Sequence, residues 1–270
     1  MNKVRTKGTK FGQCNICNNY CKLTDDHIPP KGSVNIQKVG IRSITQIIDT
    51  VNPGICRVSQ NGVKFRSLCE KCNNLRLGKQ FDPSLNDFSR KVARIIRLRS
   101  RYIFPQNIDV EIRPQRVARS IIGHLLAAEI RDDMADSPRK APMVDAMRQY
   151  FLDEMLDLPN DLRLYFWPYP ANRQVILRGI GLVSGKHIVI GDFLKYFPFA
   201  FWLAYQPPKN IVDVMKDREI LIRGYSIDMQ STVSIATRKQ DTFRVNWPET
   251  PDDTEIILLN DGMCFIADPI

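Results

Sequence analysis

Two Cys-x-x-Cys pairs constrain the fold of this chain more than any other feature of its sequence. The pairs are Cys14 with Cys17 and Cys69 with Cys72, and residues 18 to 68 separate them. Four thiolates are the number of ligands that a tetrahedral structural zinc takes. Four free thiols in a reduced core are the other interpretation, but two matched pairs favour the metal. We therefore predict a structural Zn²⁺ bound by these four cysteines.

The cysteine count also bears on the compartment. Seven cysteines are an odd number, and four of them fall in the two pairs. This usage suits metal binding in a reducing compartment better than a disulfide framework. The basic, polar N-terminus has no apolar signal segment, and no stretch approaches the length of a membrane span. We expect a cytoplasmic protein with no membrane partner.

Positive charge is concentrated in the part of the chain that carries the cysteine pairs. The formal net charge is +10; residues 1 to 105 contain 20 Lys and Arg against 6 Asp and Glu, and residues 106 to 270 contain 19 against 23. A basic segment of this kind favours an anionic partner, although charge alone says nothing about the fold. The sequence thus indicates a nucleic acid as partner.

An Asp-His dipeptide lies between the two cysteine pairs. Asp26 and His27 end an expected strand over residues 20 to 27, which Pro29 and Pro30 must terminate because proline donates no ladder hydrogen bond. Asp26 and His27 could converge on one metal ion only where the regular pleat breaks down, and the double proline supplies that break. Hydrolysis of a phosphodiester needs a water, a base and a cation. His27 is suited to be the base, and Asp26 offers a hard oxygen ligand.

The residue after the second cysteine pair could complete such a site. Asn73 follows Cys72 at the start of an expected helix, and Asn74 competes with it for the same role. Carboxylate and amide oxygens suit Mg²⁺ or Mn²⁺, whereas thiolates suit Zn²⁺. We therefore expect two different metals, with Asp26 and Asn73 as ligands of the second.

Residues 11 to 80 resemble the HNH endonucleases, also called His-Me finger or ββα-metal nucleases, in their zinc-stapled variant. The resemblance rests on Asp26-His-Ile-x-Pro between one Cys-x-x-Cys pair and Leu68-Cys-x-x-Cys-Asn73. It implies a treble-clef ββα unit, His27 as general base and one divalent ion held by Asp26 and Asn73. It also implies DNA as the usual substrate, most often double-stranded, cut to leave a 5′-phosphate and a 3′-hydroxyl.

The middle asparagine of the family pattern is the least certain position. Asn61 is the nearest candidate, but it lies eight residues before Cys69, and Asn61-Gly62 is also a strong turn signal. Asn35 and Asn52 are the other candidates. The turn predicts a hairpin between residues 56 to 60 and 63 to 68.

Gly78 and Pro83 are expected to end the zinc-bound unit. An arginine-rich helix is expected after it. Residues 89 to 102 show an apolar face opposite a basic one. The basic face carries Arg90, Arg94, Arg97 and Arg101. A solvated charged face would normally mix both signs, so we predict that these arginines contact phosphates.

The remaining pattern predicts an α+β fold in three parts. Helices are expected over residues 114 to 130, where His124 is a packing residue, and over residues 142 to 156. From residue 162 the chain shows short apolar runs typical of a mainly antiparallel sheet, namely residues 162 to 169, 174 to 182, 187 to 190, 199 to 205, 219 to 222, 232 to 236, 242 to 245 and 255 to 259. The predicted parts are a nuclease domain over 1–80, a helical segment over 81–158 and a β-rich domain over 159–270.

Two functions are compatible with this pattern. The first is a metal-dependent endonuclease, with specificity or regulation, including a protein partner or activator, assigned to residues 159 to 270. The second is a zinc-dependent nucleic-acid-binding protein that does not cut. A binder would lose affinity with salt and would not need His27, whereas a nuclease would need His27 and Mg²⁺ or Mn²⁺. By analogy with small HNH proteins, we expect a role in prokaryotic defence or in a mobile element.

Overall fold

The three-dimensional description comes from a computed structural model of the chain. It describes residues 4–33, 37–48, 56–99, 101–130, 141–184, 186–237, 245–253, 255–259 and 263–270. The predicted α+β class is confirmed, because several helices accompany sheets whose strands pair antiparallel. In the described residues, no helix is both long and apolar enough to cross a membrane.

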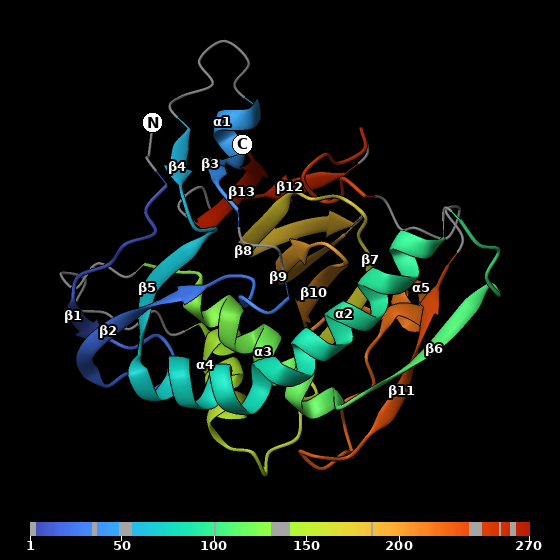
Figure 1. The fold of residues 1–270 in the computed structure, drawn as a ribbon, viewed down its shortest axis with the longest axis horizontal. Coiled ribbons are helices and arrows are strands. Elements are labelled where there is room, and N and C mark those ends of the chain that lie inside the picture. The colour runs from blue at the N-terminus through green and yellow to red at the C-terminus, as the bar shows by residue number, and fades with distance from the viewer. Residues whose placement is uncertain are drawn as a thin grey trace.

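A small antiparallel sheet carries the first cysteine pair and the Asp-His dipeptide. Its order is β1 (Phe11–Gln13), β2 (Tyr20–His27) and β5 (Lys64–Cys69). The π-helix η1 (Lys71–Phe81) follows β5 and runs directly into α2 (Asp82–Leu98), as Figure 1 shows. The expectation that Gly78 and Pro83 end the unit is therefore wrong. Pro83 lies in the first turn of α2, so its missing N–H falls at the junction where the π-helix gives way to the α-helix.

The large sheet combines strands from both ends of the chain. Its order is β4-β3-β13-β8-β9-β10-β7, and β12 pairs with β8. The strands are β3 (Val39–Ser43), β4 (Arg57–Ser59), β7 (Leu162–Pro168), β8 (Gln174–Ser184), β9 (His187–Tyr196), β10 (Phe199–Tyr205), β12 (Ile256–Leu258) and β13 (Cys264–Pro269). The sheet therefore crosses the boundary placed at residue 80.

The predicted Asn-Gly hairpin is wrong, although the turn itself exists. Gly62 has φ of 70°, and the Ser59 hydroxyl donates to its carbonyl oxygen at 2.6 Å. The flanking strands diverge, because β4 pairs with β3 in the large sheet while β5 pairs with β2 in the small one. The turn therefore connects two sheets.

A two-stranded ribbon, β6 (Asn107–Ile112) with β11 (Ser231–Ala236), extends beside the large sheet (Figure 1). The other helices are α1 (Ile44–Ile48), α3 (Pro114–Ala127), α4 (Pro142–Leu152), α5 (Lys209–Met215) and the short 3₁₀ helix η2 (Lys216–Arg218). Strands β1, β3, β6 and β13 are not among the strands that the sequence predicts. Residues 219 to 222 form no strand beyond one bridge at Glu219, and residues 242 to 245 lie almost wholly outside the described residues.

Helix α3 is the centre of the core. Almost all its side chains are buried, as its apolar pattern predicts, and it packs against η1, α2, α4 and β5. The end of α3 is held by the small sheet: the Asn15 amide donates to the carbonyls of Leu126 and Glu129, at 2.9 and 2.8 Å, and the Ser67 hydroxyl donates to Ala127 at 2.7 Å. These donors satisfy carbonyls that a helix end leaves without an intrahelical partner.

Candidate metal centre and active site

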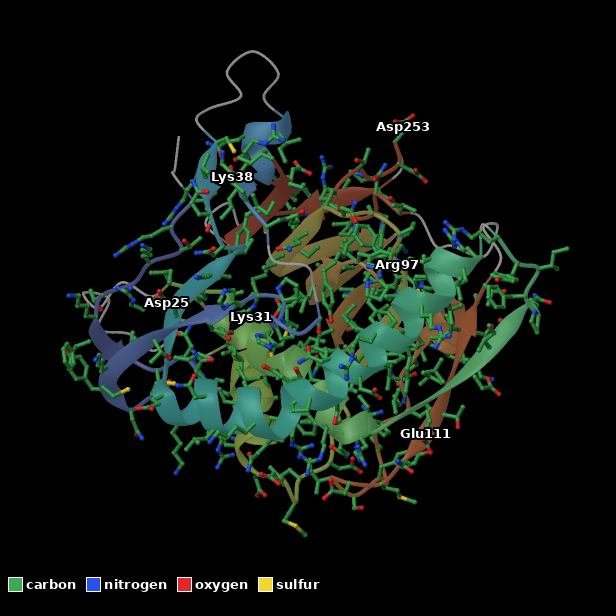
Figure 2. The ribbon with its side chains drawn as sticks, viewed as in Figure 1. Asp25, Lys31, Lys38, Arg97, Glu111 and Asp253 are labelled. Atoms are coloured by element: carbon green, nitrogen blue, oxygen red, sulfur yellow. The ribbon has the colours of Figure 1, made fainter. Side chains whose placement is uncertain are left out.

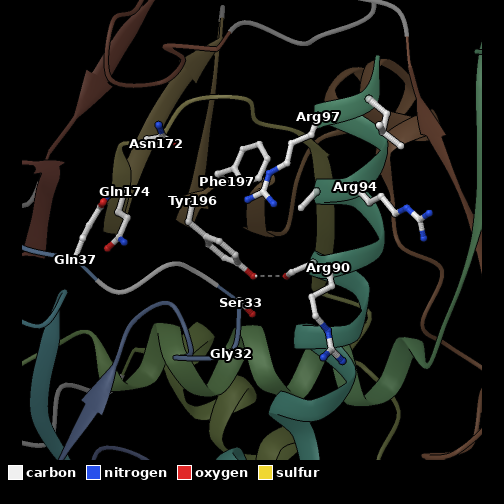
Figure 3. A pocket seen from close by; sticks show the side chains of 13 residues that line it. Gly32, Ser33, Gln37, Arg90, Arg94, Arg97, Asn172, Gln174, Tyr196 and Phe197 are labelled. Carbon is white, nitrogen blue, oxygen red and sulfur yellow. Dashed lines mark hydrogen bonds between the residues drawn. The ribbon is translucent and has the colours of Figure 1, made fainter. Parts of the chain in front are cut away.

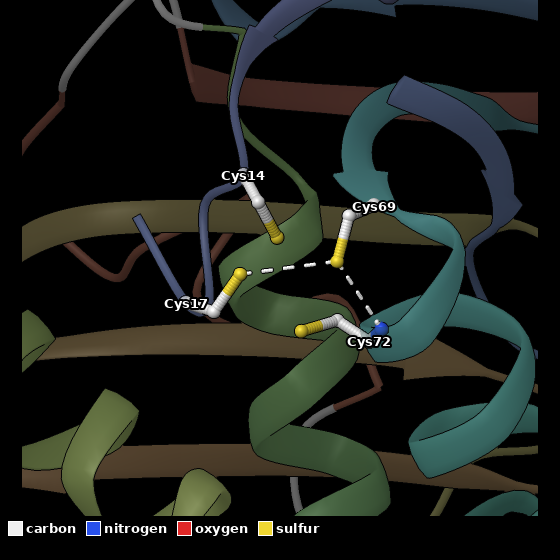
Figure 4. A group of neighbouring side chains, drawn as sticks. All are labelled: Cys14, Cys17, Cys69 and Cys72. Carbon is white, nitrogen blue, oxygen red and sulfur yellow. Dashed lines mark hydrogen bonds between the residues drawn. The ribbon is translucent and has the colours of Figure 1, made fainter. Parts of the chain in front are cut away.

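The four predicted cysteines meet at one point (Figure 4). The Sγ atoms of Cys14, Cys17, Cys69 and Cys72 all lie within 4.8 Å of one another. The Cys17 and Cys69 sulfurs are 3.8 Å apart. A tetrahedral zinc with bonds of about 2.3 Å places its sulfurs about 3.8 Å apart. The cluster therefore has the donor chemistry and the size of a structural zinc site.

The local backbone explains why each pair forms a tight knuckle. The Asn18 N–H donates to the Cys14 carbonyl at 2.9 Å, and Asn18 has a positive φ of 58°, which asparagine tolerates better than most residues. In the second pair the Cys72 N–H donates to the Cys69 sulfur at 3.4 Å. Cys21 is four residues after Cys17 but lies outside the cluster, and its thiol donates to the Asn19 carbonyl.

The thiols of the cluster have unequal affinities for protons. The thiol of Cys72 lowers the pKa of Cys14 to about 5 through their hydrogen bond. Burial, with a contribution from the neighbouring Cys14, raises the pKa of Cys17 to about 11. Four adjacent thiolates repel one another, so a cation between them is needed to hold all four ionised.

His27 lies at the end of β2 and is half-buried. Burial and the positive charge of Lys64 lower its pKa below the usual value near 6.5, and Lys31, next to the end of β2 in Figure 2, acts in the same direction. The imidazole is therefore neutral at pH 7 and can accept a proton. The backbone of Asn61 lies beside the ring and acts in the opposite direction, to raise this pKa.

Asn61 thus reaches the predicted site in an unexpected way. Its side chain is exposed, and its backbone is the part that lies beside His27. The turn explains this placement, because Asn61-Gly62 brings the backbone beside His27 before β5 pairs with β2. Asn35 and Asn52 lie outside the described residues.

Asp26 lies next to His27 but points into the protein. It is only 5% exposed, and its Oδ2 is 2.9 Å from Nδ1 of His124 in α3. The register of β2 against β5 shifts between Thr24 and Asp25, directly before this residue. The pleat is therefore interrupted upstream of the dipeptide as well as ended by the prolines that follow it.

His124 joins Asp26 to a second carboxylate that the sequence did not single out. Its Nε2 lies 3.0 Å from Oδ1 of Asp82, which also accepts the Ser120 hydroxyl at 2.7 Å. Burial acts to lower the pKa of His124, but the charges of Asp26 and Asp82 outweigh it and raise the pKa to about 10. His124 is thus a doubly donating imidazolium that links β2 to the start of α2.

Asn73 contacts residues of β2 other than Asp26 and His27. Its amide nitrogen donates to Thr24 Oγ1 at 2.9 Å and to the Asp25 carbonyl at 3.2 Å. Both bonds join the first turn of η1 to β2 through the amide nitrogen of Asn73. They do not involve its amide oxygen, which is the atom that would bind a metal ion. Asp26 likewise binds His124 through Oδ2. The hard oxygen donors expected for Mg²⁺ or Mn²⁺ are thus on adjacent elements.

The predicted arginines are exposed along α2 and just beyond it. Arg90, Arg94 and Arg97 lie on the helix, while Arg101 follows its end at Leu98. Val92 and Ile96 are buried on the opposite face, as the amphipathic pattern predicts.

No protein-family model, curated protein or solved structure matched this chain. The functional assignment therefore rests on the residues and their geometry alone.

Proposed function

We propose that this protein is a metal-dependent endonuclease that hydrolyses phosphodiester bonds of nucleic acid, most often DNA. The observation that carries the proposal is the cysteine cluster, which joins the knuckle before β2 to the helix after β5 and so fixes the strand that ends in His27. The succession of knuckle, β2, β5 and η1 is the one expected of the zinc-stapled ββα unit of the HNH endonucleases. Its zinc would be structural because all four ligands are thiolates.

In the proposed mechanism His27 is the general base. Its lowered pKa keeps it neutral at pH 7, so that a ring nitrogen can take a proton from the attacking water. Asp26 and Asn73 are the residues that would hold one Mg²⁺ or Mn²⁺, and the ion would supply positive charge to the scissile phosphate. His124 holds the Asp26 carboxylate in place from behind. The exposed arginines of α2 bind the phosphates of the substrate.

The decisive experiment is plasmid nicking and linearisation by purified, zinc-loaded protein with Mg²⁺ or Mn²⁺ at low salt. His27→Ala is expected to abolish cutting while retaining zinc. His187→Ala is the matched control, because His187 is exposed at the start of β9 and lies outside the site. Cutting by the wild type and by His187→Ala, but not by His27→Ala, supports the base assignment.

A folded, zinc-loaded protein that binds DNA and never cuts it would contradict the nuclease proposal. That result would favour the non-catalytic zinc-dependent binding protein. Unchanged cutting by His27→Ala would reject the base assignment alone.

A further inference from the structure

A pocket of about 510 Å³ opens along the exposed side of α2. Figure 3 shows it between the loop after β2, the exposed side of α2 and the sheet residues around Tyr196. Gly32, in its wall, is five residues after His27, so their Cα atoms lie at most about 18 Å apart. The volume falls in the range of about 300 to 1,000 Å³ typical of small-molecule sites.

The wall formed by α2 is strongly basic. Arg90, Arg94 and Arg97 all line the pocket, and none of its lining residues is acidic. Arg97 extends over the ring of Phe197, 5.2 Å from its centroid, and so presents a guanidinium plane to the pocket. Arg90 and Arg97 are seven residues apart, about 10 Å along the helix. One strand of B-form DNA carries about three phosphates over that length.

The opposite wall carries a buried hydrogen-bond acceptor without a donor. Gln174 is 8% exposed, and its Oε1 is buried and has no hydrogen-bond partner within the described chain. A buried polar atom left unpaired is destabilising, so this oxygen points to a ligand that brings an N–H or O–H group. The pocket floor is already paired, because the hydroxyls of Tyr196 and Ser89 lie 3.3 Å apart.

We propose that this pocket binds one unstacked nucleotide of a nucleic-acid strand. Arg90 and Arg97 bind phosphates on either side of it, the base lies against the Arg97 guanidinium, and an N–H of the base donates to Gln174 Oε1. Every nucleobase carries such a donor, and guanidinium planes are common stacking partners of unpaired bases. The identity of this strand as substrate rests on the proposed nuclease function. The length of the arginine row favours a strand over a free nucleotide.

The test measures binding separately from cleavage. A fluorescein-labelled single-stranded DNA 15-mer is titrated into His27→Ala protein without added Mg²⁺, over a series of salt concentrations. Arg97→Ala and Arg90→Ala are each expected to weaken binding about five-fold or more and to lower the slope of log K against log salt by about 0.7. Gln174→Leu is expected to weaken binding about three- to ten-fold with no change of slope.

Arg113→Ala is the matched control, since Arg113 is exposed directly before α3 and lies outside the pocket. It is expected to change affinity less than two-fold. Zinc content and circular dichroism of every variant verify that it is folded. Arg97→Lys, which keeps the charge but loses the planar group, is expected to restore the salt slope and only part of the affinity.

Normal binding by the Arg97 and Gln174 variants, or no binding of the oligonucleotide by the parent protein, overturns the inference. Displacement of the 15-mer by a millimolar nucleoside monophosphate, with the same variant dependence, supports a nucleotide site. If the protein binds the monophosphate but not the 15-mer, the ligand of the pocket is a free nucleotide, and the proposed strand is wrong. A wild type that cuts plasmid while these variants bind normally would reject this inference alone. Pocket-dependent binding by a wild type that never cuts would reject the nuclease alone.

Discussion

At the scale of single residues, two histidines have opposite electrostatic surroundings. His27 has lysines nearby and is held neutral, whereas His124 lies between two carboxylates and is held positive. A neutral imidazole can take a proton, while a doubly protonated one can only donate hydrogen bonds. Reaction chemistry therefore belongs to His27, and positioning belongs to His124.

Replacing His124 is expected to destabilise the fold strongly. His124→Ala leaves the buried Asp26 and the nearby Asp82 facing an empty space without their shared cation. Removing one partner of a buried ion pair costs about 3–5 kcal/mol, so the free energy of unfolding should fall by about that amount. Urea denaturation measures it, and His187→Ala should change it by less than about 0.5 kcal/mol. A loss below about 1 kcal/mol for His124→Ala would contradict the charged linkage.

The cysteine cluster and His124 show how far the sequence alone reaches at this scale. The two cysteine pairs were recognisable because metal-ligand spacing is local. The apolar pattern around His124 predicts a packing residue. Its charged role is hidden because its two partners are 98 and 42 residues away in the sequence. Nothing local to an apolar helix signals such partners. The place of the Asn61 backbone beside His27 was equally hidden, because side-chain identity does not report where the backbone lies.

At the scale of elements, the small sheet with its cysteine cluster and helix α3 stabilise each other. The knuckle residue Asn15 is 2% exposed, its side chain donates to two carbonyls at the end of α3, and its own carbonyl accepts from Arg148 at 2.7 Å. The end of the helix is thus capped by a residue more than a hundred positions earlier in the chain. A zinc ion bound by the four clustered cysteines would keep that residue in place.

Asn15→Ala is therefore expected to cost stability without removing a zinc ligand. It leaves two carbonyls near the end of α3 without their donor, at a cost of about 1–3 kcal/mol in the free energy of unfolding. Thermal and urea denaturation measure the loss, and zinc content should stay at one ion per chain. Asn19→Ala is the control, because Asn19 is exposed in the same knuckle and uses only its backbone carbonyl there. Equal stability of the two variants would contradict the capping role.

Elements with a strong local period were predictable, and those defined by distant pairing were not. The buried helix at residues 114 to 127 and the strand at 199 to 205 agree with their patterns. The Asn-Gly turn was found, but its strands join different sheets, because the competing partners β2 and β3 come from elsewhere in the sequence. Strand β13 was missed although it lies between β3 and β8.

At the scale of the whole molecule, the large sheet ties the proposed nuclease unit to the C-terminal half. Strand β13 pairs with β3 over five residue pairs, from Phe265 with Ser43 to Pro269 with Val39. One buried apolar cluster also runs from the four clustered cysteines through α3 to β10 and β13. The division at residues 80 and 158 is therefore a proposal about roles, and physical contacts cross both boundaries.

We consequently expect residues 1–80 not to fold alone, even with zinc. In that fragment β3 lacks its partner β13, and the end of α3 that the knuckle holds is absent. A fragment with zinc should show poorly dispersed amide signals by NMR and no cooperative thermal transition. The full chain should unfold in a single transition, and removal of zinc by a chelator should lower its midpoint for signals from both sheets together. A well-dispersed, zinc-binding 1–80 fragment would instead identify an independent domain. It would also show that the contacts between β3 and β13 are not needed for the nuclease unit to fold.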